Sequence, residues 1–240
     1  MKKILLILFC LNLSAQYCKV VYNVVPTYGT LLSPDFKSKN YSKFLADMIA
    51  NSDEALKTMF YNLIVNDQNS IFEVDENKLI TKNIIALTSA ANDKYYIKQD
   101  SILELKNNRV SANLAVIISS RQNWIYFNEA KTIGGYKCLK AQIELPWRSG
   151  KDRNEGKPTY IVTAWYCPTI PIKQGPKGFG NLPGLILELQ DDSVTFQATM
   201  VEFENVPIIP KNYLKKYTRI PQDKYLERIH EMARSMNFTK

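Results

Sequence analysis

The chain has few of the residues that acid–base or nucleophilic catalysis requires, because it contains a single histidine, His230. A Ser-His-Asp triad would need this histidine to meet a serine and an acid in space, yet no G-x-S-x-G segment marks a nucleophile. One histidine and no C-x-x-C pair disfavour a zinc site. The pair Asp191-Asp192 falls in an expected turn, where solvated carboxylates are common. The sequence therefore favours a non-enzymatic chain without cofactor or metal, with an unusual hydrolase as a less favoured alternative.

The segment 168–184 contains eight glycines and prolines in seventeen residues, so it predicts an irregular crossover. Gly178-Phe179-Gly180 resembles part of a phosphate-binding loop. The next glycine, Gly184, follows a proline and precedes a strand, whereas a dinucleotide fold needs a helix at that point. The spacing therefore excludes nucleotide binding of that kind.

A turn is the better interpretation of the end of this segment. Pro183 and Gly184 suit the two central positions of a type II turn, since proline fixes φ and glycine accepts a positive value. The flanking Leu182 and Leu185 predict that the turn faces inward, with each leucine contributing about 1.5–3 kcal/mol on burial. Gly180 and Asn181 belong to the same predicted structural turn.

Cys138 and Cys167 are candidates for a disulfide. The segments 136–145 and 159–167 read as paired strands around a charged loop, which brings these two cysteines opposite each other. Cross-strand geometry allows a bond but often strains it. Two free thiols are the alternative, and Cys18 would then be a third.

Short β-branched and aromatic runs follow one another along most of the chain, which predicts consecutive antiparallel hairpins. Gly134-Gly135 suits a turn between two of these strands. The predicted fold is α+β and β-rich: a curved, mainly antiparallel sheet or half-barrel, with one helix inserted in the N-terminal half and one at the C-terminus. No linker demands a second domain, so residues 17–240 form one predicted unit.

The inserted helix is predicted from Tyr41 onward, where apolar residues recur at helical spacing. The stripe comprises Phe44, Leu45, Met48, Ile49, Ala55, Leu56, Met59 and Phe60. Asn51-Ser52-Asp53 interrupts it, with Ser52 expected to cap the second part. We expect the stripe to be a core face. The C-terminal helix is predicted to begin near Pro221.

The first residues predict a secretory signal. Lys2 and Lys3 precede an apolar run that is too short to span a bilayer, and Ser14-Ala15-Gln16 supplies a cleavage site. We therefore expect residues 1–16 to be removed and the product to be periplasmic or on the cell surface, without a transmembrane span. The net charge of +8 is spread along the chain and does not indicate a nucleic-acid partner.

Three blocks resemble one known family. The run N-L-P-G-L-I-L-E-L, the preceding T-A-W-Y with P-T-I-P-I and Q-G-P, and the upstream I-G-G-Y-K-C-L-K-A are similar to segments of the GLPGLI family. That family comprises exported Bacteroidota proteins of unestablished function. Asn181 stands where the signature has its first glycine, and asparagine tolerates positive φ better than most residues. The resemblance implies compartment and fold more than activity.

Two kinds of binding function fit these features. The first is an exported protein whose curved sheet presents an apolar groove under the crossover to an apolar ligand, a peptide or an outer-membrane partner. Its candidate lining residues are Trp124, Trp147, Trp165, Tyr166, Phe179 and Leu182. The second is an envelope protein-interaction factor without a small ligand. A cavity of several hundred Å³ would favour the first, and an exposed apolar patch the second.

Overall fold

The computed structural model describes most of the chain beyond its first residues. The described residues are 17–32, 40–67, 69–90, 93–98, 101–106, 111, 113–118, 123–146 and 159–237. The predicted signal segment 1–16 and Trp147 lie outside them. None of the helices in these ranges has both the length and the apolar character that crossing a bilayer requires.

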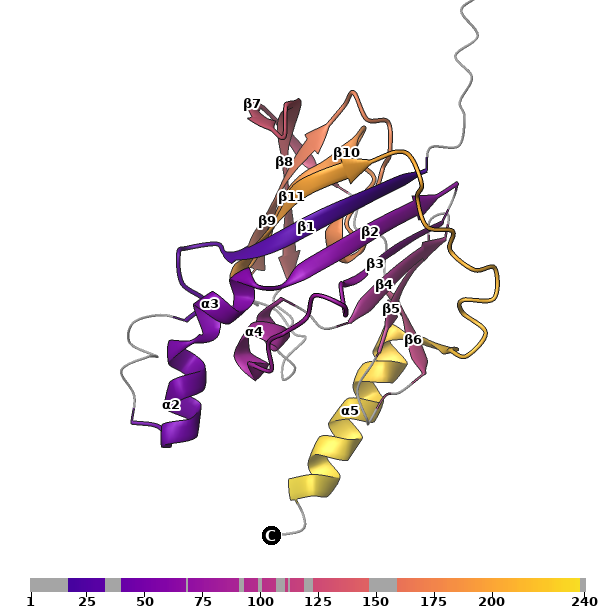
Figure 1. Ribbon diagram of the computed structural model, residues 1–240. Coiled ribbons are helices and arrows are strands. Elements are labelled where there is room, and N and C mark those ends of the chain that lie inside the picture. Colours follow the sequence, from indigo (N-terminus) through magenta and orange to yellow (C-terminus); the bar gives the residue numbers. More distant parts are fainter. Residues whose placement is uncertain are drawn as a thin grey trace, which may run out of the picture.

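A single sheet of twelve strands dominates the molecule and curls around its own inner face (Figure 1). The strands are β1 (Cys18–Pro26), β2 (Phe60–Asn66), β3 (Asn69–Val74), β4 (Lys94–Lys98), β5 (Ser101–Leu105), β6 (Leu114–Ile118), β7 (Ile125–Ile133), β8 (Tyr136–Pro146), β9 (Thr159–Cys167), β10 (Leu185–Asp191), β11 (Val194–Glu202) and β12 (Thr218–Pro221). Their order across the sheet is β12-β6-β5-β4-β3-β2-β1-β11-β10-β9-β8-β7. The predicted β-rich, curved, mainly antiparallel fold is confirmed.

One pairing departs from the antiparallel pattern, because β12 runs parallel to β6. Sequence reasoning missed this strand, which has only four residues and ends in a proline. The two edge strands of the sheet are reached differently along the chain. β12 follows β11 after the irregular segment 203–217, whereas β7 is the outer strand of a hairpin with β8.

The helices are short except for the last. They are α2 (Lys43–Ala50), α3 (Ser52–Lys57), α4 (Ile84–Ser89) and α5 (Gln222–Asn237), with one 3₁₀ turn, η1 (Pro176–Gly178). Figure 1 shows α2, α3 and α4 grouped at one end of the sheet, and α5 extending from the region of β6. The helices therefore lie at the ends of the sheet and do not cover a whole face of it.

The predicted helix from Tyr41 is two helices that break at Asn51, which confirms the interruption. Asn51 precedes α3 without a side-chain cap, and the Ser52 hydroxyl donates back to the Ile49 carbonyl at 2.9 Å. Ser52 therefore closes the end of α2 instead of capping α3. The core-face expectation is only partly correct, because Leu56 is buried while Phe44 is 71% exposed.

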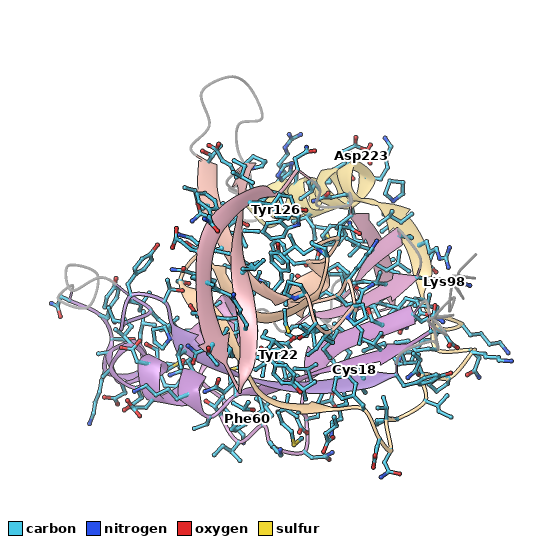
Figure 2. All side chains as sticks on the ribbon, turned by 90° about the horizontal axis from the view of Figure 1, so that it is seen from above. Cys18, Tyr22, Phe60, Lys98, Tyr126 and Asp223 are labelled. Atoms are coloured by element: carbon cyan, nitrogen blue, oxygen red, sulfur yellow. The ribbon has the colours of Figure 1, made fainter. Side chains whose placement is uncertain are left out.

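The main core lies inside the curl and is rich in aromatic rings. Phe72 stacks on Tyr61 with ring centroids 5.2 Å apart, and Phe196 meets both rings edge-on. Figure 2 shows side chains filling the space that the curled sheet encloses. A smaller cluster lies on the outer side of β3–β6, where Tyr213 stacks on Tyr96 at 5.8 Å. Both sides of that half of the sheet are therefore covered.

Candidate functional site

The crossover, residues 168–184 between β9 and β10, passes through the inside of the curl. Its turn η1 contacts β3, β4 and β5, which lie on the far half of the sheet from β9 and β10. Ser70, on β3, donates a hydrogen bond to Gln174 at 3.3 Å. The crossover thus joins the two halves of the sheet across the core.

The turn at Pro183 is tighter than the predicted type II turn. The Gly184 N–H donates to the Leu182 carbonyl at 2.8 Å, whereas the Leu185 N–H donates to the carbonyl of Ile170 at 3.0 Å. A bond between residues two apart defines a γ-turn, here centred on Pro183. A second γ-turn is centred on Pro171, where Ile172 N–H donates to Ile170 O at 2.7 Å. The type II prediction is wrong because a distant carbonyl, that of Ile170, takes the Leu185 donor.

Two glycines of the crossover allow backbone segments to approach where a side chain would not fit. A Cβ on Gly184 would lie 2.1 Å from the Cys167 carbonyl oxygen, and one on Gly180 would lie 2.4 Å from the Lys173 oxygen. Asn181 adopts a φ of 62°, which agrees with the tolerance expected of asparagine at this position. Leu182 and Leu185 are fully buried. These residues fasten the crossover to the start of β10.

Four of the five described candidate lining residues belong to this packed interior. Trp124 donates its indole N–H to the Gly180 carbonyl at 2.9 Å, and its ring lies 6.1 Å from that of Phe179. Phe179 and Leu182 are fully buried, and Tyr166 is 5% exposed. The crossover itself occupies the apolar surface that a ligand would need.

Trp165 lies apart from the other four. In the register of the sheet it is directly beside Lys140 and Glu188, and the Lys131 ammonium lies 4.4 Å from its ring centroid. Lys131 also forms an ion pair with Glu188 at 2.7 Å. Trp165 is therefore surrounded by charged side chains and packs, only partly buried, against the main core; its role as a lining residue stays a prediction.

A buried ion pair holds the middle of the crossover. Lys177, which has a φ of 53°, contacts Asp191 at the end of β10, and both side chains are largely removed from solvent. The Lys177 ammonium also lies 5.9 Å from the Phe196 ring centroid. Sequence reasoning treats Asp191 as a solvated turn residue, and the structure corrects this because the crossover folds over that turn.

A second polar cluster, also missed from the sequence, lies between β4, β5 and α5. Glu104 accepts a hydrogen bond from the Tyr95 hydroxyl at 2.9 Å and pairs with Lys106 at 3.1 Å. Lys106 also pairs with Asp93 at 2.8 Å and lies 5.2 Å from the Tyr225 ring centroid. Burial lowers the pKa of Lys106, but Glu104 and Asp93 outweigh it and raise the pKa. Lys106 is therefore protonated near neutral pH, where it forms ion pairs and cannot act as a base or nucleophile.

The three described cysteines are free thiols, all buried. Cys138 and Cys167 lie next to the pair Leu139 and Tyr166, which is at the end of the β8–β9 register. The two cysteines are therefore opposite each other, as the sequence predicts. Each thiol contacts its own strand region: Cys138 donates to the Tyr136 carbonyl, and Cys167 lies 3.0 Å from the Thr169 hydroxyl. Within the described residues no group of histidine, cysteine and acidic side chains is placed to hold a metal ion.

Exposed apolar side chains lie instead on α2, at the start of α4 and in the segment that precedes α4. We define the α2/α4 surface by Phe44, Leu45, Ile80 and Ile84, of which three are at least 61% exposed. The Asn83 side chain, which caps α4, donates to the Met48 carbonyl of α2 at 2.7 Å and so ties the two helices together. The helical period reveals the stripe on α2, but the sequence does not show that part of it lacks a partner.

Comparison with known proteins adds a family-level likeness. A family model described as a protein of unknown function, Porph_ging, matches residues 124–188. This range begins at Trp124 and includes β7, β8, β9 and the crossover. The search of curated proteins found no significant match.

Solved structures of PNGF-II have a similar fold. The forms in space groups P21 and C2 each align with a TM-score of 0.51, at 18% and 16% identity, and cover 90% of this chain. The alignment covers 33% of the PNGF-II chain, so this chain spans about a third of that protein's length. At such low identity the likeness concerns the fold alone.

We predict that Gly184→Ala destabilises the protein strongly. The new methyl group would collide with the Cys167 carbonyl at a φ of 159°, and overpacking together with backbone strain costs about 2–5 kcal/mol. Gly29→Ala is the matched control, since Gly29 also has positive φ but open space around it, so only a strain of about 1 kcal/mol is expected. Urea denaturation measures both. Equal losses in the two variants would contradict the close-approach role of Gly184.

We also predict that the buried thiols of Cys18 and Cys138 are protonated and unreactive in the folded protein. Burial raises the pKa of Cys138 to about 12, and that of Cys18 to about 12, from an ordinary value of 9.0. The folded state therefore keeps protons that the unfolded state loses, and the free energy of unfolding falls as the pH rises from about 9 to 12. Cys138→Ala should flatten this decline in urea titrations.

Alkylation followed by peptide mapping without reductant checks the same thiols. Cys18 and Cys138 should stay unlabelled in the folded protein at mildly alkaline pH and label fully after unfolding, because the thiolate is the reactive form. Recovery of a Cys138–Cys167 disulfide peptide would contradict the free-thiol arrangement.

Proposed function

We propose that the chain is an exported, non-enzymatic module that binds a partner protein through the α2/α4 surface. One observation carries this proposal. The aromatic residues of the inner face are buried in the packing of the crossover, while Phe44, Ile80 and Ile84 are 71%, 78% and 61% exposed. Exposed apolar side chains of this size on one surface are typical of interaction sites.

The alternative of an enclosed apolar ligand has less support. Phe179 and Leu182 have no exposed surface, and Trp124 is held by its hydrogen bond to Gly180. A ligand under the crossover would have to displace this packing and leave a buried carbonyl without its donor, which costs about 1–3 kcal/mol. The second of the two binding hypotheses, interaction without a small ligand, therefore fits the geometry better.

A hydrolase is also disfavoured by the residues that could serve it. His230 is exposed on α5 and contacts neither Glu104 nor Asp191 among the described interactions. Those two carboxylates form ion pairs with Lys106 and Lys177. Such pairs stabilise a fold but leave no group ready to donate or accept a proton.

A protein partner fits the α2/α4 surface better than a lipid surface does. Interfacial membrane helices carry many lysines and arginines on the polar side, whereas α2 has one of each sign, Lys43 and Asp47. In PNGF-II, a fold of this kind makes up about a third of a longer chain and so stands beside further polypeptide. With export predicted from residues 1–16, the partner would be an envelope or outer-membrane protein.

We predict that Phe44→Ser and Ile84→Ser abolish partner binding without unfolding the protein. Both side chains are mostly exposed, so the free energy of unfolding should change by no more than about 0.5 kcal/mol. A photo-crosslinking amino acid at position 44 or 84 should capture one discrete envelope protein. The Ser variants should reduce copurification of that protein at least tenfold.

Ile208 provides the matched control, because it is 79% exposed in the segment between β11 and β12, away from α2. Ile208→Ser should retain the partner, and a crosslinker at position 208 should not capture it. If positions 44 and 208 capture the same set of proteins, or the Ser variants bind as well as wild type, the α2/α4 surface is not the binding site.

A further inference from the structure

Strand β7 leaves one side of the sheet open along its whole length. It is the last strand in the order, and among the described residues it pairs only with β8. β7 has nine residues, none of them buried, whereas β12 at the other end has four. A long exposed edge is a template for pairing with another strand. In Figure 2 the labelled Tyr126 marks this strand at the rim of the curl.

The hairpin between β7 and β8 fixes which backbone groups face the open edge. Ile133 pairs with Tyr136 across Gly134 and Gly135, which have φ values of 55° and 86°. Two such residues form a type I′ turn, whose flanking residues exchange both of their hydrogen bonds. The N–H and C=O groups of Ile133 and Lys131 therefore point toward β8. Those of Ala130 and Thr132 point away, toward the open edge.

The side chains of β7 alternate regularly between the two faces. Between Tyr126 and Ala130, β7 advances four residues while β8 advances two, from Ala141 to Leu139. β7 therefore has two extra residues at this point. Because two is an even number, its side chains before and after the irregularity keep the same alternation between the faces. Contacts agree: Lys140 pairs with Glu129 at 2.9 Å and lies 5.1 Å from the Phe127 ring centroid. Phe127, Glu129, Lys131 and Ile133 thus share the outer face.

The sequence of β7 is complementary to itself about Ala130. In F-N-E-A-K-T-I, residues 127–133, an antiparallel copy centred on Ala130 sets Glu129 opposite Lys131 of the second copy. The same register sets Asn128 opposite Thr132 and Phe127 opposite Ile133. Opposite charges and apolar pairs in facing positions each stabilise a sheet. We propose that β7 pairs with β7 of a second copy of this chain, around a twofold axis at Ala130.

Neighbouring registers are less favourable. In an antiparallel pair, residues that lie directly opposite each other have their side chains on the same face of the sheet. A twofold axis normal to the sheet must therefore set one residue opposite the same residue of the second copy. An axis at Glu129 or Lys131 would set like charges against each other, which destabilises a sheet. With the axis at Ala130, the outward N–H and C=O groups of the two Ala130 residues hydrogen-bond to each other. Glu129 and Lys131 then form a non-hydrogen-bonded pair, in which side chains are closest. Charge and backbone geometry therefore select the same register.

Ala130→Pro tests this arrangement in the full chain. Proline removes an N–H that faces the open edge, so the monomer should keep its circular dichroism spectrum and melting temperature. Light scattering with size-exclusion chromatography should show a dimer for wild type and a monomer for Ala130→Pro. Ala130→Val keeps the N–H and should remain dimeric. A monomeric wild type, or a dimer that persists with proline, would overturn the proposal.

A cysteine pair keeps the test decisive if the proline variant fails to fold. At the twofold axis the two Cα atoms would lie about 5.5 Å apart, within disulfide range. Ala130→Cys should therefore oxidise quickly to a covalent dimer. Thr132→Cys would face Asn128 of the second copy and should oxidise at least tenfold more slowly. Equal rates, or no covalent dimer from Ala130→Cys, would exclude this register.

Discussion

The close approach of Gly184 to the Cys167 carbonyl is the constraint on which the interior depends. It lets β10 begin directly beside the end of β9, with the crossover folded back between them. The γ-turns at Pro171 and Pro183 tighten the loop, and Ile170 supplies the carbonyl that binds the first N–H of β10. The remaining chain can then cross the core as far as β5. This junction therefore holds the crossover against the inner face of the sheet, beside core residues of α3 and α4 such as Leu56 and Ala86.

This filling determines where the molecule can bind anything. An open curled sheet would ordinarily offer a groove, but here Phe179, Leu182 and Trp124 fill it from within. The polar groups that reach the interior are also engaged: Lys177 pairs with Asp191, and Glu104 with Tyr95 and Lys106. The two interaction sites that we propose, the α2/α4 surface and the edge of β7, therefore both lie outside this interior.

The sequence predicts most strands well because each has a period of two and is bounded by turn residues. It does not predict β12, since a four-residue strand ending in Pro221 has no period to detect. It identifies the crossover and the inward leucines from composition, and the positive φ of Asn181 from its chemistry. The type of turn at Pro183 depends on Ile170, which is distant in sequence, so local rules give the wrong answer.

The predicted binding residues show the same limit. Residue type makes Trp124 and Phe179 candidate lining residues of an apolar groove, but it does not reveal that they pack against each other in a filled interior. Likewise, helical spacing identifies the stripe that contains Phe44 and Leu56, but not that Leu56 is buried while Phe44 is 71% exposed. Exposure depends on contacts between distant segments, which a single sequence does not specify.

The sheet that encloses this filled interior is open at both ends of its strand order. A β-barrel closes when its strands can meet around a lumen whose side chains fit inside. Here the space inside the curl holds a backbone segment as well as side chains, and the twelve strands do not close into a barrel (Figure 2). The sheet therefore ends at β7 on one side and at β12, beside α5, on the other. The crossover thus fills the internal groove, while the outer side of β7 has no strand partner among the residues that the structure describes.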